Sequence, residues 1–335
     1  MKDNMLYSFN LAKRFVSDCK HPIPVIREDY FFYYLNLYEE DFLALTKYKK
    51  LVKIIEERFD GDSEKFLYEY YQIRDNIINE IMNSEAYEKF NSLDMTKFEI
   101  KFRSNISSKD IYNFNNIDKF YISVDLKKAN FQVLKKIDKE LVLNCETYED
   151  LIGKFTDIDY IKESKYARQV IFGKLNPKRH ITIEKYYTYQ IYKKIVDIFP
   201  SLSDKCVSLS NDEMIFNVEF LLYNDKLKCY SIRRDIERIA QSFGFDVRVE
   251  FFGLTAYSLV HKETDKIRNS FFVKEYFATD GKFDLISAPL PYHALMYKLY
   301  KDIPLEETDY HFEYEGLDAK LCEEFYLSKA KRLNM

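Results

Sequence analysis

The stretch Phe120-Tyr-Ile-Ser-Val-Asp125 is a short run of β-branched and aromatic residues that ends in a carboxylate. Such a run predicts a β-strand, and the apolar spacing of Leu126–Val142 predicts a helix directly after it. Further along the chain, two more β-prone runs, Cys206–Leu209 and Met214–Leu222, flank the acidic turn Ser210-Asn211-Asp212-Glu213. This pattern predicts a β-hairpin with carboxylates at its tip. The sequence therefore places acidic residues at the ends of strands that are far apart in the chain.

Helical spacing dominates the residues before these strands. Asp62 or Ser63 is expected to cap a helix that runs to about Met82, with apolar residues on one face at every third or fourth position. Residues 43–55 predict a preceding helix, antiparallel to it. The residues of the apolar face are Phe66, Tyr70, Ile73, Ile77 and Ile81, and they are expected to lie in the core.

Alternating helices and strands are expected in the rest of the chain. Gly173 and Pro177 are predicted to break the helical pattern that begins at residue 146. The expected helices are 146–170, Ile181–Phe199, Ser231–Ser242 and Tyr292–Tyr300, and the expected strands lie around Val247–Phe252 and Ala256–Val260. Together these elements predict an α+β protein with one large or two ordinary domains.

Composition excludes several classes of protein. Nearly half of the 335 residues are hydrophobic, and only 7 Gly and 7 Pro are present, which argues against a disordered or low-complexity chain. The five cysteines have no ligand spacing, so reduced thiols are expected and a structural zinc site is not. No apolar run reaches membrane-spanning length, and a cytoplasmic protein is expected. A net charge of −4 disfavours a protein that coats DNA but permits an enzyme with a basic groove.

Two carboxylates that converge from distant strands are what phosphoryl transfer requires. Two metal ions about 4 Å apart can activate a 3′ hydroxyl and stabilise the leaving pyrophosphate. Oxygen ligands favour two Mg²⁺ ions, or Mn²⁺, as the cofactors. The chemistry also needs cations for a triphosphate. The segment 162–179 supplies them, with Lys162, Lys165, Arg168, Lys174, Lys178 and Arg179 against the single acid Glu163.

Three segments resemble, in the same order, the motifs of the family A DNA polymerases, which include bacterial DNA polymerase I. Ser123-Val-Asp125-Leu-Lys-Lys-Ala-Asn130-Phe-Gln is similar to the first palm motif of that family. Arg168-Gln-Val-Ile-Phe172-Gly173 is similar to the motif on the fingers helix, and Asn211-Asp212-Glu213-Met-Ile-Phe-Asn-Val to the second palm motif. The similarity covers about residues 40–225.

The resemblance implies a template-directed DNA polymerase that adds nucleotides to a primer 3′ hydroxyl. Asp125 and Asp212 would be the metal ligands, together with the carbonyl of Leu126. Glu213 would be an accessory carboxylate near the primer end. The implied partners are a nucleic acid primer-template and nucleoside triphosphates, and the small size leaves room for an accessory replication protein of a phage-like or mobile-element system.

The same resemblance assigns residues to the incoming nucleotide. Arg168 would contact the triphosphate, Phe172 would stack on the base and sugar, and Lys165 or Lys162 would replace a second arginine of the family. Asn130 stands where members that make DNA carry Glu, which leaves the choice between deoxyribose and ribose open. Further departures from the family are Gln132 in place of Arg, Asn211 in place of His, Asn176 in place of Tyr and Ser164 in place of Arg.

The implied domains are a helical thumb at residues 1–97, a palm with an antiparallel sheet at 98–145 and 200–260, and shortened fingers at 146–199. Residues 261–335 form an extension whose role the resemblance does not indicate. No proofreading exonuclease domain is expected within these 335 residues.

Each motif alone also has an ordinary structural explanation. Asp125 can cap the following helix, the Asn211-Asp212-Glu213 turn can be acidic because it is solvated, and Phe172 can pack into the core. Two other functions therefore remain open. One is a different palm enzyme, similar to a single-subunit RNA polymerase, a primase or a reverse transcriptase. The other is a catalytically inactive protein that binds nucleic acid or a protein partner.

Overall fold

The computed structural model describes residues 5–100, 111–218, 226–277 and 282–330. The chain divides into two compact units, each assembled from segments that are remote in sequence. Unit 1 comprises Met1–Ser84, Cys145–Leu175 and Pro289–Glu324, and unit 2 comprises Glu85–Asn144, Asn176–Ala288 and Phe325–Met335.

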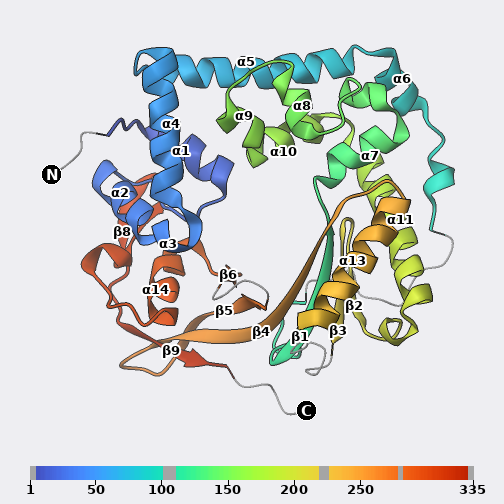
Figure 1. The fold of residues 1–335 in the computed structure, drawn as a ribbon. Coiled ribbons are helices and arrows are strands. Elements are labelled where there is room, and N and C mark those ends of the chain that lie inside the picture. Colours follow the sequence, from blue (N-terminus) through green and yellow to red (C-terminus); the bar gives the residue numbers. More distant parts are fainter. Residues whose placement is uncertain (1–4, 101–110, 219–225, 278–281, 331–335) are drawn as a thin grey trace. The chain divides into compact units, whose positions relative to one another are not determined.

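Unit 1 is mainly helical (Figure 1). Its described α-helices are α1 (Phe9–Cys19), α2 (Glu28–Leu37), α3 (Glu39–Phe42), α4 (Ala44–Phe59), α5 (Ser63–Met82), α8 (Tyr148–Gly153), α9 (Asp159–Glu163), α10 (Lys165–Lys174) and α14 (Leu290–Tyr300). A 3₁₀ turn, η4 (Glu307–Tyr310), leads into a small hairpin made of β7 (His311–Tyr314) and β8 (Leu317–Lys320).

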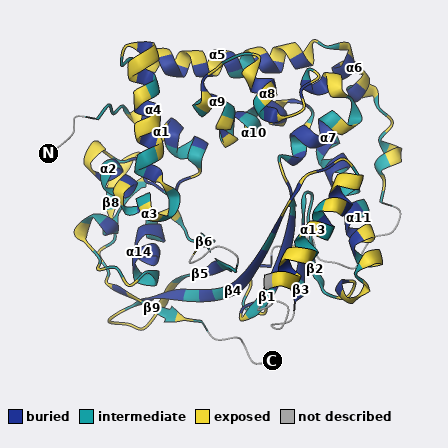
Figure 2. Cartoon of the chain, in the orientation of Figure 1, coloured by how far each residue is buried: buried dark blue, intermediate teal, exposed yellow. Residues whose placement is uncertain are grey.

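The start and the apolar face of α5 confirm the sequence prediction. The carboxylate of Asp62 accepts hydrogen bonds from the backbone N–H groups of Glu64 and Lys65, at 3.0 and 3.1 Å, and so caps the helix. All the residues predicted for the apolar face are buried, and Figure 2 shows buried and exposed residues alternating along the helix. The predicted antiparallel arrangement is wrong, because α5 runs across the direction of α4 in Figure 1. Asp60 and Gly61 turn the chain between them with left-handed φ values of 54° and 76°.

The basic segment of unit 1 begins at a well-capped helix. Ser164 accepts a hydrogen bond from the N–H of Ala167 at 3.0 Å and starts α10. The break predicted at Gly173 is present but one residue later, because α10 ends at Lys174. Pro177 instead occupies the first turn of the next helix, where proline is favoured because its missing N–H would have no helical partner.

Unit 2 combines helices with an antiparallel sheet. Its described helices are α6 (Glu85–Ser92), α7 (Ala129–Ile137), α11 (Pro177–Ile198) and α13 (Lys226–Ser242), with 3₁₀ turns η1 (Met95–Phe98), η2 (Lys139–Val142) and η3 (Pro200–Leu202). Its described strands are β1 (Lys119–Leu126), β2 (Cys206–Leu209), β3 (Glu213–Val218), β4 (Val247–His261), β5 (Ile267–Tyr276), β6 (Phe283–Ile286) and β9 (Phe325–Lys329). Residues 219–222 of the predicted strand Met214–Leu222 lie outside the described residues.

The sheet has the strand order β2-β3-β1-β4-β5-β6, and β9 also pairs with β4. All these pairs are antiparallel. The two strands expected around residues 247–252 and 256–260 are one strand, β4, which pairs with β1 through its first half and with β5 through its second half. The predicted α+β class with an antiparallel sheet is therefore confirmed.

Helices α11 and α13 pack on one face of the sheet, and a separate apolar cluster lies on the other. Val249 and Phe251 are buried on the face that α13 contacts, and the ring of Tyr192 on α11 stacks on that of Phe216 with centroids 6.1 Å apart. On the opposite face, Tyr121, Phe252 and their neighbours form an apolar cluster. Because side chains alternate along a strand, Ser123 and Asp125 share this second face.

The compact units group the predicted segments in a way that the sequence did not indicate. Residues 1–84 of the expected thumb and 146–175 of the expected fingers belong to unit 1. Residues 176–199, which contain all of α11, belong to unit 2 with the expected palm segments. The expected extension contributes β5, β6 and β9 to the sheet of unit 2. Within the described residues, every helix is too short or too polar to cross a lipid bilayer.

Candidate functional site

The end of β1 lies beside the turn of the β2–β3 hairpin. Asp125 is directly opposite Glu213 in the antiparallel register. The N–H of the next residue, Leu126, donates a hydrogen bond to the backbone carbonyl of Asp212 at 2.8 Å. The structure thus brings together the three acidic residues that the sequence proposed, Asp125, Asp212 and Glu213.

The hairpin turn is held in place by α11 as well as by its own backbone. The hydroxyl of Thr188 on α11 donates to the carbonyl of Asn211 at 2.8 Å. The N–H of Ser210 donates to the carbonyl of Glu213, also at 2.8 Å. The backbone on both sides of Asp212 has such partners, so the turn that carries this residue is held in a defined position.

Three charged residues, Arg248, Glu250 and Lys274, and the serine Ser123 surround the site on this face of the sheet. Arg248, opposite Asp125 on β4, places its Nη2 3.0 Å from Oδ2 of Asp125 and its Nε 3.5 Å from Oε1 of Glu250. The ammonium group of the buried Lys274 lies 3.3 Å from Oε2 of Glu250. The hydroxyl of Ser123 donates to Oε1 of Glu213 at 2.5 Å.

Asp125 is a perturbed carboxylate. Burial raises its pKa from 3.8 to about 6, and the neighbouring Asp212, Glu213 and Glu250 act in the same direction, whereas Arg248 opposes them. Its side chain nevertheless remains 26% exposed. Desolvation and like charges both favour the protonated acid, so this site is short of positive charge.

The donor set fits a hard divalent cation in its chemistry. The carboxylates of Asp125 and Asp212 and the carbonyl of Leu126 are oxygen donors of the type that Mg²⁺ and Mn²⁺ prefer. A cation between the two carboxylates would relieve the repulsion that raises the pKa of Asp125. Among the described residues, no group of three or more His, Cys, Asp or Glu side chains is arranged to hold a metal ion. Water or a phosphate oxygen would have to complete the ligand shell.

A groove of about 410 Å³ lies next to Arg248, at the end of the sheet where β4 and β5 are not yet paired. Residues 248–251 of β4 pair with β1, but the pairing of β4 with β5 begins only at Phe252. The groove is lined by Arg233, Arg248, Glu250, Tyr276, Lys282 and Asp284, among others. The Nε of Arg233 is buried without a hydrogen-bond partner among the described residues. The groove therefore offers cations beside the acidic cluster.

The helix after β1 carries two residues that depart from the family pattern. The side-chain carbonyl of Asn130 accepts a hydrogen bond from the N–H of Phe131 at 2.9 Å. The amide of the buried Gln132 donates to the carbonyls of Lys127 and Asp246, and its Oε1 accepts from the N–H of Asp246 at 2.6 Å. Gln132 therefore joins the turn after Asp125 to the start of β4 and has a structural role.

The residues predicted to contact the nucleotide lie on α10 in unit 1. Phe172 is fully buried and packs on Tyr148 with ring centroids 6.1 Å apart, and its predicted stacking on a base stays a prediction. Arg168 is half-buried, with its guanidinium carbon 5.7 Å from the centre of the Tyr148 ring, and Lys165 is exposed. The predicted contacts of Arg168 and Lys165 with a triphosphate stay predictions.

Sequence reasoning missed Arg248, Glu250 and Lys274. A signal was present, because Val247-Arg-Val-Glu-Phe251 alternates apolar and charged residues, as expected for a strand with one charged face. Their proximity to Asp125 follows from the register between β1 and β4, which the sequence does not contain.

No family model, curated protein or solved structure matches this chain. The resemblance to the family A DNA polymerases therefore rests on the motif residues alone.

Proposed function

We propose that the chain is a template-directed nucleotidyltransferase, a DNA polymerase that extends a primer 3′ hydroxyl. The observation that carries the proposal is the pairing of the end of β1 with the hairpin turn, which juxtaposes Asp125 with Asp212 and Glu213. These residues come from positions almost ninety apart in sequence, in the order that first suggested the polymerase motifs.

The residues of the site would have distinct tasks. Asp125 and Asp212, with the carbonyl of Leu126, would hold Mg²⁺ or Mn²⁺, which supplies charge neutralisation for the attacking and leaving oxygens. Glu213, oriented by the hydroxyl of Ser123, would act near the primer end. Arg248 keeps the acidic cluster partly neutralised and is exposed enough to reorient.

Sugar selection would differ from that of typical family members. Asn130 provides an amide where a carboxylate would help to exclude a ribose 2′ hydroxyl. An uncharged residue discriminates less strongly by charge and hydrogen bonding, so we expect measurable incorporation of ribonucleotides as well as deoxyribonucleotides.

One observation favours a second candidate, a catalytically inactive protein that binds nucleic acid or a partner. Arg248 already forms an ion pair with Asp125, and a permanent ion pair of this kind would exclude a metal ion from the carboxylate. The two candidates differ in whether a divalent cation competes with Arg248.

Extension of a labelled primer on DNA and RNA templates, with dNTPs or NTPs and Mg²⁺ or Mn²⁺, tests the proposal. Asp212→Ala should reduce extension at least about a thousandfold, equivalent to about 4 kcal/mol of transition-state stabilisation. Asp204→Ala is a matched control, because Asp204 is an exposed aspartate near the same hairpin but outside the site, and it should leave the rate unchanged.

The outcomes separate the candidates. A wild-type protein without extension activity on any template, or activity that Asp212→Ala leaves intact, would contradict the polymerase proposal. Binding of Mg²⁺ measured by calorimetry offers a readout that does not depend on activity. The enzyme predicts binding that Asp212→Ala removes, whereas the inactive protein predicts none.

A further inference from the structure

Unit 1 contains a separate cavity of about 720 Å³ that the proposed polymerase chemistry does not use. One wall is a single face of α4, because Leu43, Lys47, Lys50 and Ile54 follow each other at intervals of three or four residues. The opposite wall comes from the end of α1 and from α9. The volume lies within the range of small-molecule sites in proteins, roughly 300–1,000 Å³.

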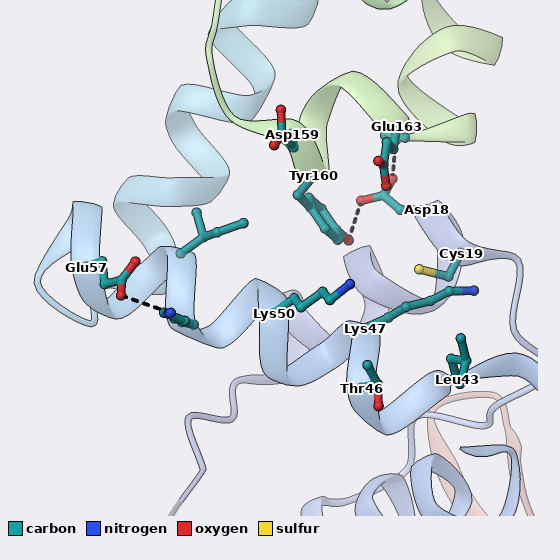
Figure 3. A pocket seen from close by; sticks show the side chains of 13 residues that line it. Asp18, Cys19, Leu43, Thr46, Lys47, Lys50, Glu57, Asp159, Tyr160 and Glu163 are labelled. Atoms are coloured by element: carbon teal, nitrogen blue, oxygen red, sulfur yellow. Dashed lines mark hydrogen bonds and ion pairs between the residues drawn. The ribbon is translucent and has the colours of Figure 1, made fainter. Parts of the chain in front are cut away.

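Two lysines supply the positive charge of this cavity. Figure 3 shows Lys47 and Lys50 extending from α4 along the open space, with Lys47 directed toward Cys19. Neither ammonium group forms an ion pair or a hydrogen bond within the part of the chain that the structure describes, whereas the neighbouring Lys53 pairs with Glu57 at 3.6 Å. Lys47 and Lys50 are therefore available to a ligand.

The acidic residues of the opposite wall are largely neutralised. Asp18 forms an ion pair with Arg14 at 3.2 Å and accepts hydrogen bonds from Tyr160 and Ser164. Asp159 pairs with Lys162 at 3.1 Å. With Glu57 paired to Lys53, these ion pairs leave Lys47 and Lys50 against the single exposed carboxylate of Glu163.

Apolar surface lies beside these cations. Leu43 is the N-cap residue of α4 and has 53% of its surface exposed, and Ile54 lines the cavity one turn beyond Lys50. Apolar side chains next to unpaired lysines fit a molecule that combines an anionic group with an apolar body.

We propose that this cavity binds a small phosphate monoester with an apolar body, whose phosphate lies between Lys47 and Lys50 and whose body contacts Leu43 and Ile54. A phosphate monoester carries a charge of about −1.5 to −2 at neutral pH, which matches two ammonium groups one helical turn apart. A carboxylate carries half of this charge. The site lies within unit 1, so the inference is independent of the polymerase proposal.

The test uses phenyl phosphate as the probe, with inorganic phosphate and benzoate as comparisons, and measures binding to the full chain by calorimetry and by ³¹P line broadening. The double variant Lys47→Met/Lys50→Met should weaken binding of phenyl phosphate at least about tenfold. Lys49→Met is the matched control, because Lys49 is an exposed lysine of the same helix that does not line the cavity. It should leave the affinity unchanged.

Three results would each overturn the inference. The first is no binding of phenyl phosphate to the wild-type chain, and the second is equal affinity in the double variant. The third is binding of inorganic phosphate or benzoate as tight as that of phenyl phosphate, because it would remove the role of the apolar body or of the second charge. All three lysines are exposed, and circular dichroism would verify that the variants are folded.

Discussion

Asp18 in unit 1 and Asp125 in unit 2 are both largely removed from solvent, and burial raises the pKa of both. Their surroundings are opposite in kind. Asp18 has an arginine, two tyrosine hydroxyls and a serine hydroxyl as partners, at 2.8 to 3.2 Å. Asp125 has Arg248 as its cation and three further carboxylates nearby. A buried carboxylate with every oxygen satisfied serves the fold, whereas one among like charges is a candidate to bind a cation.

The strongest test of this comparison is to remove the satisfied carboxylate. Asp18→Ala should lower the free energy of unfolding by about 3–5 kcal/mol, because it leaves the buried guanidinium of Arg14 without its counter-charge. The hydroxyls of Tyr70, Tyr160 and Ser164 would lose an acceptor at the same time. Urea-induced unfolding measures the change.

Asp159→Ala is the control for this substitution. The carboxylate of Asp159 is 82% exposed and pairs with Lys162, so its removal should cost less than about 0.5 kcal/mol. If Asp18→Ala is as mild as the control, the network around Asp18 is not structural and the contrast with Asp125 disappears.

Substitution of Asp125 is expected to raise the free energy of unfolding rather than lower it. The size of this change should depend on pH. The folded-state pKa of Asp125, about 6, lies above its ordinary value of 3.8, so the folded protein holds this proton more tightly than the unfolded chain does. The resulting stability is present below about pH 4 and is lost as the pH rises through 6. Asp125→Asn cannot ionise, and it should therefore be more stable than the wild type at pH 7.5 by about 3 kcal/mol.

Measurements of unfolding free energy from pH 4 to pH 7.5 would check this expectation. The difference between Asp125→Asn and the wild type should shrink toward zero as the pH falls to 4. A constant difference, or a variant less stable than the wild type at pH 7.5, would show that Arg248 satisfies Asp125 as completely as Arg14 satisfies Asp18. In that case the inactive candidate would gain support.

The elements of both regions were predictable from local pattern. The cap at Asp62, the apolar face of α5, the strand ending at Asp125 and the acidic hairpin turn all follow from spacing and turn chemistry within a few residues. The convergence of Asp125 with the hairpin was predicted from the motifs. Its partner Arg248 was not, because it depends on which strand lies on the other side of β1.

Local sequence pattern does not determine how remote segments pack, and this explains where the structure differs from the sequence prediction. The direction of α5 relative to α4 depends on a turn at Asp60 and Gly61 whose backbone angles the sequence does not determine. Phe172 was assigned to a nucleotide because it follows Arg168 and precedes a glycine, but an aromatic side chain on an amphipathic helix is also what a core requires. The network around Asp18 joins three segments, at residues 14–18, 70 and 160–164, that no sequence pattern connects.

Gln132 provides the smallest and most local test of the contrast between satisfied and unsatisfied polar groups. Like Asp18, it is a buried side chain whose polar atoms all have partners, in this case the backbone of Lys127 and Asp246. Gln132→Ala should lower the free energy of unfolding by about 1–2 kcal/mol, because it leaves the N–H of Asp246 without that acceptor. Gln72→Ala, at an exposed position of α5, should change it by less than about 0.5 kcal/mol.

Because Gln132 fixes the turn that follows Asp125, Gln132→Ala should also slow primer extension. A loss of stability with an unchanged extension rate would separate the two roles and show that the position of Asp125 is set by the sheet alone.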